Sequence, residues 1–327
     1  MIISRTPFRV SFFGGGTDFP EFYKEHGGAT LLTAINKYCY ISAHRFGPFF
    51  KHKYRASYAQ TELVNHPSEF KHPLIRECML MLGVNVSLEL THIADLPGRT
   101  GLGSSSSFAV GLLHTLHALQ GKAPTAEQLS RESITVERDR VGDSGGHQDQ
   151  YAAAYGGFRR FQFSGKGVEA QHIDLQPSRK AELESCLMMF YMGIEQSAEN
   201  ILQEQKKRVQ HNVPALLEML KMVDEAQAIL QGRGSLDDFG RLLNDSWQRK
   251  KSLSKGISNT DIDLAYQAAR DAGALGGKLL GAGGRGFLLL YADPAQQPAV
   301  RERLKDLREV PFGFSEEGSR IIFQAPE

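Results

Sequence analysis

The sequence predicts an α+β fold of two domains, because strand and helix patterns follow one another in mixed order instead of alternating regularly. Three observations support this prediction. A segment rich in β-formers, residues 1–13, ends at three glycines; apolar and polar residues alternate over 86–91; and apolar residues at helical spacing follow the four serines 104–107. Of the 327 residues, 41% are hydrophobic, which is enough for two ordinary cores.

The first half is predicted to combine strands with two helices. Residues 29–41 mix β-branched and aromatic residues, which indicates strands beside the first one. The apolar spacing from Phe108 to Leu119 predicts a helix that ends at Gly121, and a second helix is expected from Thr125 to Arg138. A short strand over 157–163 completes this half.

The second half is predicted to begin near Pro177, which divides the chain into domains of residues 1–177 and 178–327. A strand is expected over 186–191, followed by amphipathic helices over 196–231 that are interrupted at Pro214. Another helix is expected around Trp247. A last helix over 261–272 leads into the glycine loop 281–286 and a buried strand at 287–291.

Charge and cysteine content narrow the class of protein. Lysine plus arginine number 38 against 37 for aspartate plus glutamate, which gives no support to a nucleic-acid or membrane-surface partner. The three cysteines are odd in number and widely spaced, as expected of reduced thiols. No apolar run suits a membrane span or a signal peptide. We expect a cytoplasmic protein whose oligomeric state stays open, with a homodimer as one option.

The most informative stretch is residues 97–107, in which two glycines flank a leucine and four serines follow at the start of a helix. Glycine lets the backbone approach a ligand, and the free N–H groups of a helix start attract an anion such as phosphate. A helix cap needs one serine, so four favour phosphate or Mg²⁺ binding. No Gly-Lys-Ser/Thr follows, which excludes a Walker loop. The expected phosphate-binding residues are Gly101, Leu102, Gly103, Ser104, Ser105 and Ser106.

The first strand carries Arg9 and runs into the glycine triplet at 14–16. A triple glycine after a strand allows a ligand to lie close to the backbone. Asp18 could accept hydrogen bonds from sugar hydroxyls, with help from Thr17. It could equally cap a following helix, and the residues alone leave both interpretations open.

Residues 137–150 are denser in acids and glycines than a surface loop requires. Glu137 is expected at a helix end, where its charge opposes the helix dipole and a nearby cation would favour it. Asp149 precedes a helical turn of small residues suited to burial, which makes it a candidate general base. His147 could be a base or a metal ligand, although a lone histidine in a polar loop is more often solvated.

Three stretches, residues 6–18, 97–107 and 278–286, resemble the GHMP kinase superfamily in content and order. The serine loop matches its Pro-x3-Gly-Leu-Gly-Ser-Ser pattern. The resemblance implies an N-terminal domain of the ribosomal-protein-S5 type, a ferredoxin-like C-terminal domain, and ATP and acceptor meeting between them. Residues 5–18 look like the sugar 1-kinase branch, and residues 145–151 and 247–251 resemble D-glycero-D-manno-heptose 7-phosphate kinases.

This resemblance implies ATP-dependent phosphorylation of the anomeric hydroxyl of a heptose 7-phosphate, feeding nucleotide-activated heptose to lipopolysaccharide, capsule or S-layer glycans. Fucose kinases share part of the pattern, so a kinase of L-fucose or another unphosphorylated sugar is the alternative. A sugar or nucleotide sensor on the same fold is the third hypothesis. Sensors can lose the base or the metal ligand, and here Asp149 and Glu137 are both present.

Carried over from the family, Asp149 matches the aspartate that accepts or orients the hydroxyl proton, and Arg9 matches its basic neighbour. Glu137 matches the acidic Mg²⁺ ligand, with Ser105 (or Ser104) as the hydroxyl ligand, although the loop from Glu137 to Asp149 is one residue longer than in mevalonate kinases. The sugar is expected at Gly15, Gly16, Thr17, Asp18 and Gly283. Candidates for an acceptor phosphate are the basic residues Lys37, Arg45, Lys51, Lys53, Arg55, Arg138 and Arg140.

Overall fold

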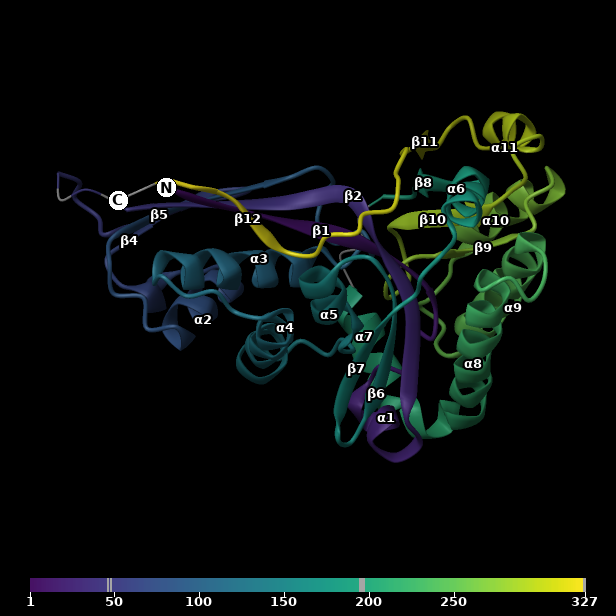
Figure 1. Ribbon diagram of the computed structural model, residues 1–327, viewed down its shortest axis with the longest axis horizontal. Coiled ribbons are helices and arrows are strands. Elements are labelled where there is room, and N and C mark those ends of the chain that lie inside the picture. The colour runs from purple at the N-terminus through teal and green to yellow at the C-terminus, as the bar shows by residue number, and fades with distance from the viewer. Residues whose placement is uncertain (46, 48, 194–197, 326–327) are drawn as a thin grey trace.

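The computed structural model describes residues 1–45, 47, 49–193 and 198–325. Within them, one sheet has the order β12-β1-β2-β5-β3-β4, with β6 and β7 attached beside β2. In Figure 1, β1, β5, β12 and the last part of β2 run side by side toward the left, while β6 and β7 extend downward from them. Its strands are β1 (Ile2–Phe13), β2 (Gly28–Arg45), β3 (Tyr54–Ser57), β4 (Thr61–Val64), β5 (Leu88–Ala94), β6 (Phe158–Ser164), β7 (Gly167–His172) and β12 (Arg320–Gln324).

The strand β2 organises this sheet. Where the sequence predicts strands over 29–41, the chain forms one strand of 18 residues that pairs with β1 along most of its length. Its first part pairs with β6 and its last part pairs with β5. The sheet therefore has two parts beside β2, one formed by β6 and β7 and the other by β5, β3 and β4. The end of β1 that leads to the glycine triplet lies near the part formed by β6.

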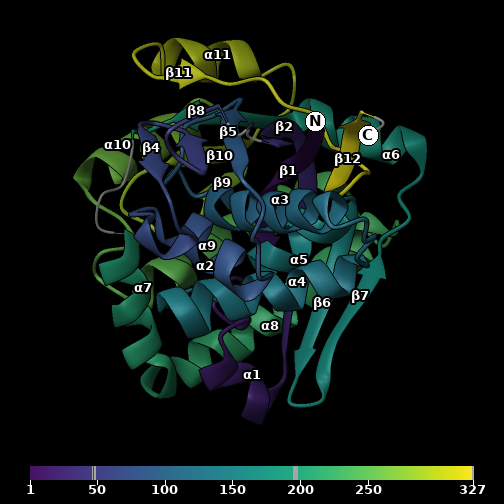
Figure 2. The same cartoon turned by 90° about the vertical axis from the view of Figure 1, so that its left-hand side faces the viewer.

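Helices cover one face of the sheet (Figures 1 and 2). The central one, α3 (Ser104–Leu119), is buried along most of its length, as the apolar residues from Phe108 to Leu119 predict. Around it lie α2 (Pro73–Met81), α4 (Ala126–Ile134) and α5 (Gln148–Tyr155), with α1 (Pro20–His26) below β6 and the one-turn η1 (Pro67–Glu69) before α2.

The second sheet has the order β11-β8-β10-β9 and is antiparallel throughout. With helices between β8 and β9 and between β10 and β11, the chain follows the ferredoxin-like βαββαβ arrangement. Its strands are β8 (Leu187–Tyr191), β9 (Gly276–Leu279), β10 (Phe287–Tyr291) and β11 (Arg308–Glu309). Its helices are α6 (Pro177–Cys186), α7 (Ala198–Lys207), α8 (Val209–Leu230), α9 (Leu236–Ser252), α10 (Thr260–Asp271) and α11 (Gln297–Arg303).

Apolar side chains join the two parts. The ring of Phe239, on α9, meets Phe12 and Phe13 of β1 edge-on, with ring centroids 5.4 and 5.1 Å apart. The last strand, β12, returns to pair with β1, so residues 320–324 lie in the first sheet. The division of the chain at residue 177 stays a prediction.

Three local predictions differ from the structure. The interruption expected at Pro214 falls at Arg208 instead, and Pro214 lies inside α8. The helix expected from Thr125 to Arg138 ends at Ile134 and continues as a π-helical segment, η2 (Thr135–Val141). The helix α6 was not expected from the sequence.

The cysteine prediction is confirmed, since Cys39, Cys78 and Cys186 are all free and buried. No helix in the described part of the chain combines the length and the apolar character that crossing a membrane requires.

Candidate active site

Arg9 and Asp149 form a bidentate ion pair. The Arg9 Nε donates to Asp149 Oδ1 at 2.8 Å and its Nη2 donates to Oδ2 at 2.9 Å. The third guanidinium nitrogen, Nη1, donates to the Gly101 carbonyl at 2.6 Å. Arg9 is buried, whereas the Asp149 side chain keeps 26% exposure. The structure thus joins the two residues predicted to act together and fixes a reachable carboxylate beside the serine loop.

The serine loop ends in an uncapped helix start. Gly103 occupies the N-cap position of α3 in the left-handed region, with φ of 74°, and no side chain caps the helix. The Ser107 N–H closes the first turn on the Gly103 carbonyl. The helix of 16 residues begins beside the Arg9–Asp149 pair, because a Cβ on Gly103 would lie 3.3 Å from Arg9 Cγ and 3.4 Å from Asp149 Oδ2. Its positive end and the N–H groups of its first turn, from Ser104 to Ser106, lie at this point. This arrangement suits an anion.

Glu137 is buried under that helix start. Its Oε1 accepts from Ser105 Oγ, and its Oε2 accepts from Ser106 Oγ, both at 2.8 Å. Gln150 Nε2 donates to Oε2 at 2.7 Å. Burial raises the pKa of Glu137 to about 7, with a smaller contribution from the nearby Asp143 carboxylate. The π-helical turns of η2 place this carboxylate, so the expectation of an ordinary helix end was wrong.

The Glu137 group fits a magnesium ion by its chemistry. Carboxylate and hydroxyl oxygens are the ligands that Mg²⁺ prefers, and a cation would relieve the burial of this carboxylate. The described residues contain no cluster of three or more histidine, cysteine, aspartate or glutamate side chains that could hold a metal alone. Mg²⁺ in proteins is commonly held by one or two carboxylates together with substrate phosphates and water.

Asp18 ties the glycine triplet to the loop before Asp149. Its Oδ1 accepts from the Gly16 N–H at 2.8 Å and its Oδ2 accepts from the Gln148 N–H at 3.2 Å. A side chain on Gly146 would overlap Oδ2, because its Cβ would lie 2.0 Å away. Burial raises the pKa of Asp18. The helix-cap interpretation was wrong, since α1 has Phe19 at its N-cap.

Thr17 and Gly283, both expected to bind sugar, make contacts within the protein. Thr17 is fully buried and its hydroxyl donates to the Gly14 and Ala29 carbonyls, both at 2.8 Å, so it stabilises the turn instead. A Cβ on Gly283 would lie 2.5 Å from the Ile257 α-carbon, so Gly283 serves close packing within the second part of the chain. Both residues thus have structural contacts of their own, and their part in sugar binding stays a prediction.

The C-terminal glycine loop packs directly on the serine loop. A Cβ on Gly101 would lie 2.2 Å from the Leu280 carbonyl oxygen, and one on Gly281 would lie 2.3 Å from the Gly101 α-carbon. A Cβ on Gly286 would lie 2.5 Å from the Thr100 carbonyl oxygen. Backbone therefore meets backbone, and the glycines of the two sequence motifs are needed at this junction.

Two buried lysines complete the site, and sequence reasoning assigned them no role. Lys250, on α9, donates to the Gly281 carbonyl at 2.6 Å, and burial together with the nearby Arg9 lowers its pKa to about 8. Lys278, on β9, donates to the Ser11 and Phe12 carbonyls at 2.9 and 3.0 Å. Both lie in stretches that carry the family resemblance, but a lysine in a helix pattern gives no signal of its burial.

His147 is half-buried, where the sequence favours a solvated side chain. Its Nδ1 lies 3.0 Å from the Tyr23 hydroxyl, and burial, with Arg138 nearby, lowers its pKa to about 4. A neutral imidazole engaged with a tyrosine is a packing group in this position. Among the basic candidates for an acceptor phosphate, Arg138 contacts this loop directly: its guanidinium donates to the Gly145 carbonyl and to Glu21.

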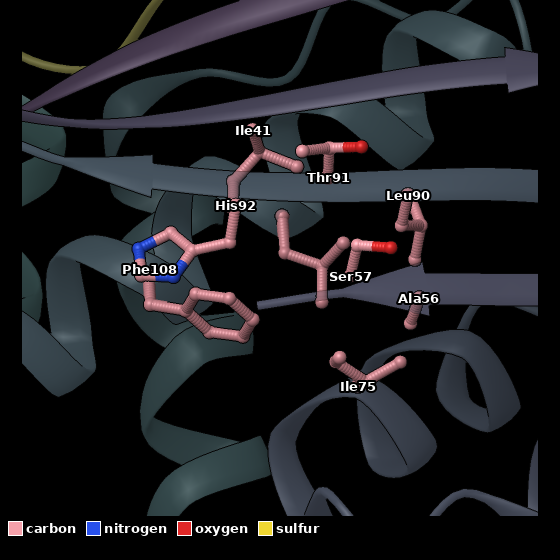
Figure 3. A pocket seen from close by; sticks show the side chains of 9 residues that line it. Ile41, Ala56, Ser57, Ile75, Leu90, Thr91, His92 and Phe108 are labelled. Atoms are coloured by element: carbon pink, nitrogen blue, oxygen red, sulfur yellow. The ribbon is translucent and has the colours of Figure 1, made fainter. Parts of the chain in front are cut away.

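A small apolar pocket lies one helical turn beyond the serine loop (Figure 3). His92 from β5 and Phe108 from α3 pack edge-on against one another at one side of it, with ring centroids 5.0 Å apart. Burial lowers the pKa of His92. Its volume of about 10 Å³ has room for no more than about one water molecule, so it is a packing gap beside α3 and not a binding site.

Comparison with known proteins assigns the chain to a family. Residues 73–157 match the model of the GHMP kinases N terminal domain, and residues 222–308 match that of the GHMP kinases C terminal. A D-glycero-alpha-D-manno-heptose 7-phosphate kinase of Campylobacter jejuni is 27% identical, over 97% of each chain. A mevalonate kinase of Pyrococcus horikoshii is 30% identical, over 72% of this chain and 69% of its own.

A solved structure agrees in fold. The crystal structure described as a D-glycero-D-manno-heptose 1-phosphate kinase from Bacteroides thetaiotaomicron has a TM-score of 0.74, with full coverage of both chains and 23% identity. Likeness at this identity shows the α+β two-domain fold alone. Together with the matched domain models and the Pyrococcus relative, it leads to one conclusion: the chain belongs to the GHMP kinase family.

Proposed function

We propose that this protein transfers the γ-phosphate of ATP to the anomeric hydroxyl of D-glycero-D-manno-heptose 7-phosphate, in the cytoplasm, for nucleotide-heptose and surface polysaccharide synthesis. The observation that carries the kinase chemistry is the Arg9–Asp149 pair beside an uncapped helix start. The heptose phosphate is supported by the Campylobacter relative, whose likeness extends over 97% of both chains.

Phosphoryl transfer depends mainly on positioning and on charge stabilisation, and each group of site residues has its own role in it. The N–H groups of Ser104, Ser105 and Ser106 bind the polyphosphate at the start of α3. Asp149 orients the anomeric hydroxyl toward the phosphorus and accepts its proton. Arg9 holds Asp149 in place through two hydrogen bonds and offsets the charge of the transferred group.

Glu137 and Ser105 would hold the magnesium ion, which supplies charge neutralisation on the phosphate oxygens. In the free protein Ser105 and Ser106 donate to Glu137, which orients its oxygens before any ligand arrives. A carboxylate fixed in this way costs little reorganisation when the nucleotide binds.

An acceptor that already carries a phosphate needs a cationic group away from Asp149. Arg138 and Lys206 both contact Glu21 Oε1, at 3.2 and 3.3 Å, next to the loop that leads to Asp149. We assign the acceptor phosphate to this pair, with Glu21 as its partner in the free protein. Two of the other basic candidates pair elsewhere: Arg140 lies 3.6 Å from Glu77, and Arg55 pairs with Glu89.

A substrate panel tests the proposal. Purified protein with ATP and Mg²⁺ is offered D-glycero-D-manno-heptose 7-phosphate, L-fucose and D-mannose, and the products are identified by ³¹P NMR. A 1,7-bisphosphate formed from the heptose 7-phosphate supports the assignment. Faster phosphorylation of L-fucose at C1 would show that the acceptor is an unphosphorylated sugar instead. If no sugar phosphate forms, both acceptor hypotheses are refuted.

A further inference from the structure

The three glycines of the triplet are there for different reasons. Gly14 has a φ of 81°, and a Cβ on it would lie 1.9 Å from the Ala29 carbonyl oxygen. Gly16 has a φ of 107°, which also excludes most side chains. Gly15 lies outside the left-handed region, and the atoms nearest to its added Cβ are 3.6 Å or more away. Neither backbone strain nor packing therefore demands glycine at position 15.

The space above Gly15 is surrounded by polar atoms. A Cβ there would lie 3.6 Å from Gln148 Nε2, 3.9 Å from Lys250 Nζ and 4.0 Å from Ser11 Oγ. These side chains come from α5, α9 and β1, so both parts of the molecule contribute. Gln148 immediately precedes Asp149, which places this cradle next to the proposed base.

The hydrogen-bond directions define what the cradle can hold. Ser11 Oγ donates to Gln148 Oε1 at 2.7 Å, which turns the amide nitrogen toward the space and leaves lone pairs on Ser11 Oγ. Lys250 donates one hydrogen to the Gly281 carbonyl and keeps two others. The three nearest polar atoms thus offer two donors, Gln148 Nε2 and Lys250 Nζ, and one acceptor, Ser11 Oγ. A hydroxyl group accepts and donates in this pattern, whereas a phosphate oxygen has no proton for Ser11.

We propose that a hydroxyl of the acceptor sugar, other than the one phosphorylated, binds above Gly15 and is held by Lys250, Gln148 and Ser11. The proposal rests on the proposed kinase function and extends it to acceptor recognition. Lys250 has only 6% exposure, and burial lowers its pKa, so its ammonium is poorly solvated in the free protein. A sugar hydroxyl gives it an additional partner and makes the second part of the chain a direct contributor to acceptor binding.

Gly15→Ala is the sharpest test, because a methyl group fits the free protein but occupies the place of the hydroxyl. Binding of D-glycero-D-manno-heptose 7-phosphate and of L-fucose is measured calorimetrically without nucleotide, and ATP binding is measured separately. We expect acceptor affinity to fall roughly 10- to 100-fold, the worth of one or two lost hydrogen bonds, while ATP affinity and the thermal midpoint stay as in the wild type. Lys250→Met should weaken acceptor binding in the same way.

Lys251→Met is the matched control, since Lys251 is the next residue of α9 and pairs with Asp263 outside the cradle. It should bind both ligands as the wild type does. A folded Gly15→Ala protein with unchanged acceptor affinity would overturn the cradle alone. If the wild type binds L-fucose and not the heptose 7-phosphate, the proposed substrate fails and the variants test the cradle with L-fucose. If it binds neither sugar, both proposals fail.

Discussion

Replacement of Glu137 by glutamine should stabilise the protein while abolishing its activity. The pKa of this carboxyl rises from 4.5 to about 7 because it is buried. The unfolded chain releases the proton near pH 4.5 and the folded protein near pH 7, so the folded state binds more protons between these values and stability falls as the pH rises through this window. A rise of this size corresponds to about 3 kcal/mol of lost stability above pH 7.

Glutamine removes that loss because it cannot ionise. Urea unfolding in EDTA at pH 5 and pH 8 is the assay, with Glu182→Gln, an exposed position on α6, as control. We expect the gain in the free energy of unfolding of Glu137→Gln over the wild type to be larger at pH 8 than at pH 5 by about 2 kcal/mol. The altered contacts with Ser105 and Gln150 also change the free energy of unfolding of the variant, but by the same amount at both pH values. A difference independent of pH would refute the reasoning.

Three more predictions concern the same site. Asp149→Asn should lower kcat by roughly 10²- to 10⁴-fold, the usual contribution of a positioned base, with ATP affinity nearly unchanged in a fluorescence titration; turnover like that of the wild type would remove Asp149 from this role. Ser105→Ala should raise the Mg²⁺ concentration for half-maximal activity by about tenfold, as loss of a ligand or of its support does, and an unchanged Mg²⁺ profile contradicts its assignment. Gly101→Ala places a Cβ 2.2 Å from the Leu280 carbonyl oxygen at a φ of 79°. The free energy of unfolding should therefore fall by about 2 kcal/mol or more. If the variant and the wild type have the same urea midpoint, the contact between the two loops does not require glycine at this position.

The sequence predicts the parts of the site whose chemistry is local. Glycines around Leu102 followed by serines indicate a helix start that receives an anion, and the structure has α3 begin at Ser104 without a side-chain cap. Arg9 and Asp149 come from family motifs, and their contact across 140 residues agrees with the resemblance. The ferredoxin-like order of β8 to β11 follows the same resemblance.

What the sequence does not predict depends on contacts made at long range. The sequence cannot distinguish Gly14, Gly15 and Gly16, which differ in their φ angles and in the approach of the Ala29 carbonyl and of Leu216. The burial of Lys250 depends on the packing of α9 against the glycine loop. The π-helical turns that bring Glu137 under α3 are held by hydrogen bonds from Ser105 and Ser106, which the pattern of residues 125–138 alone cannot reveal.

The pairing of β12 with β1 has a consequence for how this chain acquires its shape during synthesis. Residues 2–5 are made before the strand that covers their free edge, which follows more than 300 residues later in the sequence. Until then the growing chain exposes unpaired backbone groups on β1, which other nascent chains could join edge to edge. A chain shortened before Arg320 would therefore leave this edge of β1 open to pairing with other chains.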